Sequence, residues 1–129
     1  MFELSSISGR RAVWIAQSDL FLDTDTRLSY PYIARVAAES PFSLDELAAI
    51  FRDEVAPIAE PNLLDIAGEW AGFPEDWLVQ SIAGRLERMP GPYRFLTNAG
   101  AQWEAVAYLV SRLRGLPPEK REGRWTAWK

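Results

Sequence analysis

The sequence of 129 residues contains no cysteine and no histidine. Without cysteine the chain forms no disulfide and offers no thiolate for zinc binding or nucleophilic catalysis. Without histidine it lacks the commonest general base and the imidazole ligand of most zinc, copper and iron sites. Ser-His-Asp and Cys-His triads are therefore excluded within this chain, and any catalysis would depend on carboxylates, lysine, tyrosine or arginine.

Long apolar runs are also missing. No window approaches the roughly 18 apolar residues of a membrane span, and residues 1–11 lack the basic start and apolar stretch of a signal peptide. Phosphate-binding glycine loops, dinucleotide fingerprints and metalloprotease helix motifs are absent, and the eight glycines are scattered. We therefore expect a cytoplasmic protein with no membrane partner, no cofactor, no catalytic residues and no metal site.

The residues that are present predict an all-α fold. Apolar residues make up 48% of the chain and charged residues 25%, which is ordinary for a globular domain of this length. Apolar residues recur at helical spacing, whereas the period-two alternation of strands is almost absent. We expect a compact bundle of about six short helices in residues 1–116, followed by a proline-led charged tail, residues 117–129, that docks through Trp125 and Trp128.

Capping residues, prolines and glycines predict where each helix begins and ends. The expected helices run from Ser8 to about Phe21, Tyr30 to Ser40, Ser43 to Val55, Asn62 to Gly72, Pro74 to Met89, and Thr97 or Asn98 to Gly115. Ser43 and Glu46 fit a capping box, and Pro57 is expected to end the third helix. The expected core stripes include Val13, Trp14, Leu20, Phe21, Ile33, Leu47, Phe51, Val55, Leu78, Ile82, Trp103, Val106, Val110 and Leu113.

The net charge of −4 is unevenly distributed along the chain. Residues 1–22 carry two acids and two bases, residues 23–76 carry twelve acids and three bases, and residues 77–129 carry four acids and nine bases. One interpretation is that the acidic middle helices pack beside the basic last helices and attract them. The other is that an acidic face docks a basic partner, with charge raising the association rate and salt weakening binding.

Two groups of acids are candidates for function. Asp19, Asp23 and Asp25 lie near the end of the first helix, where Asp19 and Asp23 would share one face and could hold magnesium with waters. Aspartate is also common where a helix gives way to a turn, which explains Asp23 and Asp25 without any ligand.

The second group is Glu69, Glu75 and Asp76, which are interleaved with Trp70, Phe73 and Trp77. The helix dipole explains Glu75 and Asp76, and a core stripe explains Trp70. Glu69 and Trp77 have no such structural explanation. Aromatic side chains beside charges are also typical of protein interfaces. The residues that we predict to bind a partner are Asp19, Asp23, Asp25, Glu69, Glu75, Asp76 and Trp77.

Two segments carry a resemblance to known proteins. The runs RRAVWIAQSDLFLDT (residues 10–24) and NLLDIAGEWAGF (residues 62–73) resemble those of a family of small bacterial proteins with no assigned function. This resemblance implies small size and bacterial origin, and it supplies no catalytic residue. In general character, an acidic, helical, cysteine-free domain also resembles the immunity proteins that neutralise bacterial toxins.

The first functional hypothesis is therefore an immunity-type binding protein that occludes a toxin, or another protein with a basic surface, through an acidic face containing aromatic residues. An alternative is a magnesium-dependent phosphohydrolase that uses Asp19, Asp23 and Glu69. A third is a nucleic-acid accessory protein that uses the basic C-terminal region, although a net acidic chain is a poor partner for phosphates. This basic region comprises Arg112, Arg114, Lys120, Arg121 and Arg124, beside Trp125 and Trp128. Exposed tryptophans would also suit a homodimer.

Overall fold

A computed structural model describes residues 4–21, 29–65, 74–91 and 93–116. Within these ranges the chain is helical and contains no strand, which confirms the all-α prediction. The elements are α1 (Leu4–Ser18), the 3-10 turn η1 (Asp19–Phe21), α2 (Tyr30–Glu39), α3 (Leu44–Ile50), the π-helical turn η3 (Phe51–Val55), α4 (Ala56–Asp65), α5 (Glu75–Glu87) and α6 (Ala99–Leu113). The expected tail, residues 117–129, lies outside the described residues.

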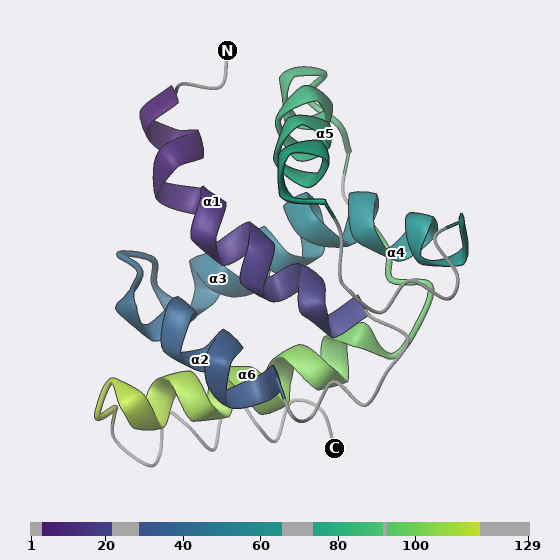
Figure 1. The fold of residues 1–129 in the computed structure, drawn as a ribbon. Helices are drawn as coiled ribbons and strands as arrows, with labels where there is room; N and C mark the ends of the chain where they lie inside the picture. The colour runs from purple at the N-terminus through teal and green to yellow at the C-terminus, as the bar shows by residue number, and fades with distance from the viewer. Residues whose placement is uncertain (1–3, 22–28, 66–73, 92, 117–129) are drawn as a thin grey trace.

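Helix α1 crosses the middle of the molecule and contacts α2, α5 and η3 (Figure 1). Helix α6 lies along the bottom of this view beside α2, and these two helices form the most extensive helix pairing. Helix α5 stands upright on the opposite side of the molecule from α6. Buried apolar side chains of these helices, including Val13 and Trp14 of α1, pack into one core cluster.

Several helix boundaries follow the residues that predicted them. Pro31 lies in the first turn of α2, and Ser40 ends that helix. The Ser43 hydroxyl accepts from the Glu46 N–H at 3.1 Å, and the Glu46 carboxylate accepts from the Ser43 N–H at 2.8 Å, which completes the capping box. Gly115 has a φ of +70° and closes α6 in a Schellman motif, with the Leu116 N–H donating to the Ser111 carbonyl.

Three predicted boundaries are wrong. Helix α1 begins at Leu4, so Ser8 lies inside it and does not cap it. Pro57 does not end the third helix, because α3, η3 and α4 follow one another without a break from Leu44 to Asp65. Asn62 is consequently an interior residue of α4 and not the cap of a new helix.

The π-helical turn explains how the chain remains helical through Pro57. In η3 the Ala56 N–H donates to the Phe51 carbonyl, five residues back, which widens the helix by one residue. Pro57 has no N–H to donate to the carbonyl of Asp53, four residues before it. The Arg85 guanidinium of α5 donates to that carbonyl at 2.9 Å instead. A side chain distant in sequence thus satisfies the acceptor that the proline leaves open.

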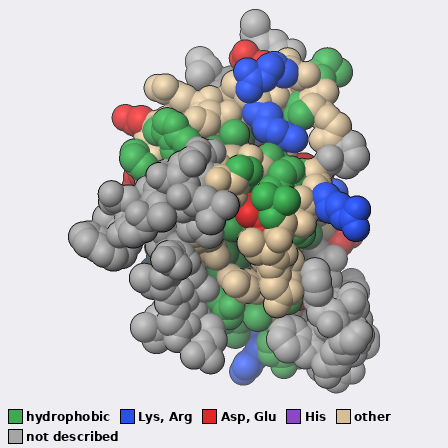
Figure 2. All heavy atoms as spheres, turned by 90° about the vertical axis from the view of Figure 1, so that its right-hand side faces the viewer, with side chains coloured by type: hydrophobic (Ala, Val, Ile, Leu, Met, Phe, Trp, Pro, Cys, Tyr) green, Lys and Arg blue, Asp and Glu red, His purple; other side chains and the backbone are tan. Residues whose placement is uncertain are grey.

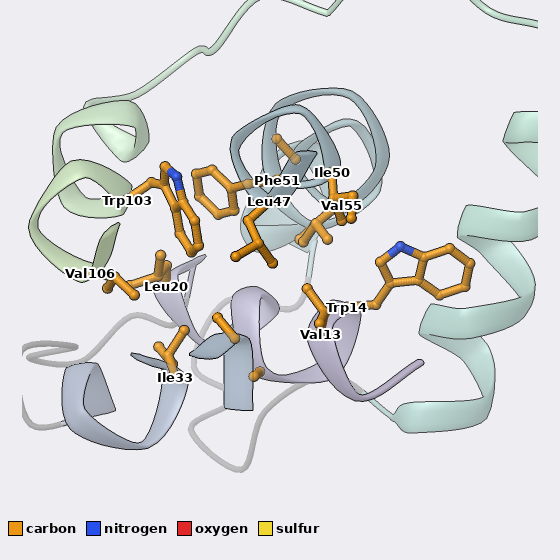
Figure 3. Close-up of a cluster of buried hydrophobic side chains, with 14 of the residues drawn as sticks. Val13, Trp14, Leu20, Ile33, Leu47, Ile50, Phe51, Val55, Trp103 and Val106 are labelled. Atoms are coloured by element: carbon orange, nitrogen blue, oxygen red, sulfur yellow. The ribbon is translucent and has the colours of Figure 1, made fainter. Parts of the chain in front are cut away.

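The core is rich in aromatic rings. Phe51 stacks against Phe21 and Trp103, with ring centroids 5.2 Å and 5.5 Å apart. Phe51 and Trp103 stand side by side at one end of the cluster, and Trp14 lies at the other end (Figure 3). Most of the residues expected in the core stripes are buried. Leu113 is 60% exposed, because it is the last residue of α6 and lines a surface groove.

Candidate functional site

The first turn of α5 presents two acidic side chains to solvent. Glu75 and Asp76 follow Pro74, and their side chains are 62% and 87% exposed. The Arg11 guanidinium of α1 lies 3.5 Å from the Glu75 carboxylate and 3.4 Å from that of Asp76. Exposed ion pairs of this kind contribute little to stability, so both carboxylates remain available to a partner. We call Glu75 and Asp76 the α5 acidic turn.

Trp77 follows the acidic turn but lies deeper in the molecule. Its side chain is partly buried and packs against the hydrophobic core. Trp77 therefore anchors the start of α5 to the core, and only part of its surface can extend the acidic turn.

Asp19 is the described member of the first predicted group. It begins η1, where the α-helical geometry of α1 ends, and its partial burial raises the pKa of its carboxyl group above the usual value. Asp23, Asp25 and Glu69 lie outside the described residues. Among the residues that the structure places, no cluster of three or more acids could hold a metal ion.

Glu54 of η3 is a largely buried acid that the sequence interpretation did not single out. Its carboxylate accepts from the Trp14 indole N–H at 2.8 Å and from the Arg10 guanidinium at 3.1 Å. Burial raises the pKa of Glu54, and the two donors partly oppose that rise. The Arg10 guanidinium also lies 5.1 Å from the centre of the Phe42 ring. Glu54 thereby links α1 to η3.

Glu60 of α4 is a second buried acid with a structural role, and it is only 3% exposed. Its carboxylate accepts from the Tyr93 hydroxyl at 2.8 Å, the Leu96 N–H at 2.7 Å, the Thr97 N–H at 2.9 Å and the Thr97 hydroxyl. Burial and the contact with Glu60 raise the pKa of Tyr93 above its usual range. The only sequence signal is that Glu60 stands alone as a charge in the apolar stretch APIAEP, residues 56–61.

Two arginines near the N-terminus neutralise part of the acidic segment, residues 23–76. Arg10 pairs with Glu54, and Arg11 pairs with the α5 acidic turn. The basic last segment uses Arg85 and Arg114 to bind backbone carbonyls. The pKa of Asp53 is lowered mainly by its hydrogen bonds from Arg52 and to a smaller extent by Arg85. The acidic middle of the chain is therefore neutralised in part by α1, which the charge pattern did not predict.

Figure 2 shows the face on the right-hand side of Figure 1. Hydrophobic side chains gather over the middle of this face, and basic side chains lie above and beside them. Acidic side chains appear there only in small spots. The large hydrophobic side chains that are exposed in the described ranges include Met89 after α5 and Leu96 before α6. Among the described residues, exposed acids also lie on α2, at Glu39, and at the start of α3, at Asp45 and Glu46.

These features define an all-α protein with exposed acids at the start of α5 and largely buried acids that join its helices. Residues 8–114 match the family described as a domain of unknown function, DUF7079, and the chain belongs to that family. No curated protein matches the chain. No solved structure matches it either. In the part of the chain that the structure describes, no helix is long and apolar enough to cross a membrane.

Proposed function

We propose that this chain is a non-enzymatic, immunity-type binding protein that neutralises a bacterial toxin by docking its acidic face on a basic surface. The observation that carries the proposal is the α5 acidic turn, where two highly exposed carboxylates stand beside a partly buried tryptophan. The absence of histidine and cysteine throughout the chain supports a binding role over an enzymatic one.

The geometry of the turn favours rapid, salt-sensitive association. Both carboxylates lie at the N-terminal end of α5, and their contacts with Arg11 are exposed and 3.4–3.5 Å long. A basic partner can replace Arg11 as the counter-charge at little cost, because solvent already screens those pairs. Trp77 holds the turn in place by packing on the core, so little order has to be gained on binding.

A capture experiment in bacterial cells that express the chain tests the proposal. The tagged wild-type chain is compared with Glu75→Lys/Asp76→Lys and with a control, Glu39→Lys/Glu87→Lys, which changes the charge equally at exposed acids elsewhere. We expect one stoichiometric partner on the wild-type and control chains, released by moderate salt and lost from the acidic-turn variant. That partner should arrest growth when it is produced without this chain.

Two results would contradict the proposal. The acidic-turn variant could retain the partner as well as the control does, which would place the interface elsewhere. Alternatively, the partner could prove harmless to cells that lack this chain, which would leave binding intact but remove the immunity role.

A further inference from the structure

A groove runs between α2 and α6 on a part of the molecule that the proposed function does not use. It has a cavity volume of about 480 Å³, within the range of roughly 300–1,000 Å³ that is typical of small-molecule sites. Its walls are mostly apolar and carry two guanidinium groups. The lining residues are Pro31, Ala34 and Arg35 of α2 and Leu109, Arg112 and Leu113 of α6.

The two arginines of the groove differ from those that stabilise the fold. Arg10, Arg11, Arg52 and Arg114 each have a hydrogen-bond or ion-pair partner. Arg35 and Arg112 are exposed, and neither has such a partner among the residues that the structure describes. The described lining contains no acid, so the groove combines an apolar floor with uncompensated positive charge.

The helices that form the groove are fixed by a third arginine. The Arg114 guanidinium donates to the carbonyls of Ala37 at 2.9 Å, Ala38 at 3.1 Å and Ser40 at 3.0 Å. These bonds join the C-terminal end of α6 to that of α2. The groove is therefore formed before any ligand arrives, which lowers the entropic cost of binding.

We propose that the groove binds a free amphiphilic anion, a carboxylate that carries a single hydrocarbon chain. The hydrocarbon chain lies on Pro31, Leu109 and Leu113, and the carboxylate meets Arg35 and Arg112. Guanidinium groups suit this head group because they donate paired hydrogen bonds to carboxylates and remain charged at every physiological pH. Charge complementarity selects an anion, and the apolar floor selects one with a chain.

Titration of the isotope-labelled full chain with decanoate, followed by amide NMR well below the micelle concentration, tests the proposal. We expect saturable shifts confined to α2 and α6, and about fourfold tighter binding for each added methylene that is buried. Butyrate, which has the head group without a long chain, and decyltrimethylammonium, which has the chain with the opposite charge, should both bind at least tenfold more weakly.

Matched variants assign the effect to the groove. Arg35→Gln/Arg112→Gln should weaken decanoate binding at least about tenfold, because each hydrogen bond between charged groups is lost. Arg88→Gln/Arg94→Gln removes the same charge from exposed arginines outside the groove and should bind decanoate as the wild type does. The NMR spectrum of each variant reports whether its fold is intact.

Three results would overturn the proposal. Decanoate could cause no saturable shift, or it could bind the groove variant and the wild type equally. The chain could also bind vesicles of anionic phospholipid through Arg35 and Arg112 while ignoring free decanoate, which would make the groove a membrane contact.

Discussion

Two pairs of acids within the same acidic stretch, residues 23–76, have opposite environments. Glu54 and Glu60 are largely buried and receive donors from segments that are distant in the chain. Glu75 and Asp76 extend into solvent, and their ion-pair partner among the described residues is the exposed Arg11 guanidinium, 3.4–3.5 Å away. The charge of a stretch therefore says little about the charge of a surface, because some of its carboxylates point inward and join helices.

Among the four acids compared, substitution of Glu60 is expected to have the largest effect on the free energy of unfolding. Glu60→Ala removes the acceptor of four hydrogen bonds, two of them from the backbone N–H groups of Leu96 and Thr97. Leaving a buried donor unpaired costs about 1–3 kcal/mol, and these four donors are part-buried, so we expect the free energy of unfolding to fall by roughly 3 kcal/mol. Urea denaturation followed by circular dichroism measures this loss.

Glu60→Gln is the informative control for that prediction. Glutamine keeps one acceptor oxygen and nearly the same volume, so it should recover part of the stability that alanine loses. A loss of less than about 1 kcal/mol in the alanine variant would show that solvent replaces the carboxylate and that Glu60 does not fix the segment before α6.

Much of the fold was predictable because its signals are local. The capping box at Ser43, the proline at the start of α2 and the glycine that ends α6 each act within one helical turn. The apolar spacing that marks Val13, Trp14, Phe51 and Val106 as core residues is equally local. Such signals can be interpreted from the sequence because the residues that cause the structure are neighbours in the chain.

Two of the three wrong boundaries, those at Pro57 and Asn62, arose where a distant residue changed the outcome. Pro57 would end an isolated helix, but the π-helical turn widens the helix there and the Arg85 side chain, 32 residues beyond Asp53, satisfies the carbonyl that the proline leaves open. Similarly, Glu60 becomes a structural residue only because residues 93–97 fold back upon it. At the candidate site, sequence reasoning selected Glu75 and Asp76 but did not predict their contact with Arg11, 64 residues before Glu75.

The next largest effect is a pH dependence at Glu54. Burial raises the pKa of Glu54 above its ordinary value of 4.5, so the folded protein holds this proton more tightly than the unfolded protein does. Between pH 4.5 and the raised pKa, the folded state binds more protons, and the free energy of unfolding contributed by Glu54 falls as the pH rises. The folded protein is therefore less stable when Glu54 is ionised than when Glu54 is protonated.

Comparison of the wild type with Glu54→Gln isolates this contribution. Glutamine still accepts from Trp14 and Arg10 but does not titrate, whereas Asp53 and its lowered pKa are common to both proteins. We expect the wild type to lose stability relative to the variant as the pH rises above 4.5, by less than the loss at Glu60→Ala. Parallel urea curves at each pH would contradict the assignment, and a difference of opposite sign would mean that Arg10 outweighs burial.

The smallest expected effect on stability is at the α5 acidic turn. Glu75→Gln/Asp76→Asn removes both charges while keeping the size of each side chain. The pairs with Arg11 are exposed, and acids in the first turn of a helix contribute only about 0.3–1 kcal/mol each through the helix dipole. We therefore expect thermal unfolding to change by an amount equivalent to about 2 kcal/mol or less for the two acids together, and high salt should shrink the difference further. A loss as large as that of Glu60→Ala would erase the distinction between the two pairs of acids, because it would make the acidic turn a structural element instead of a surface that is free to bind.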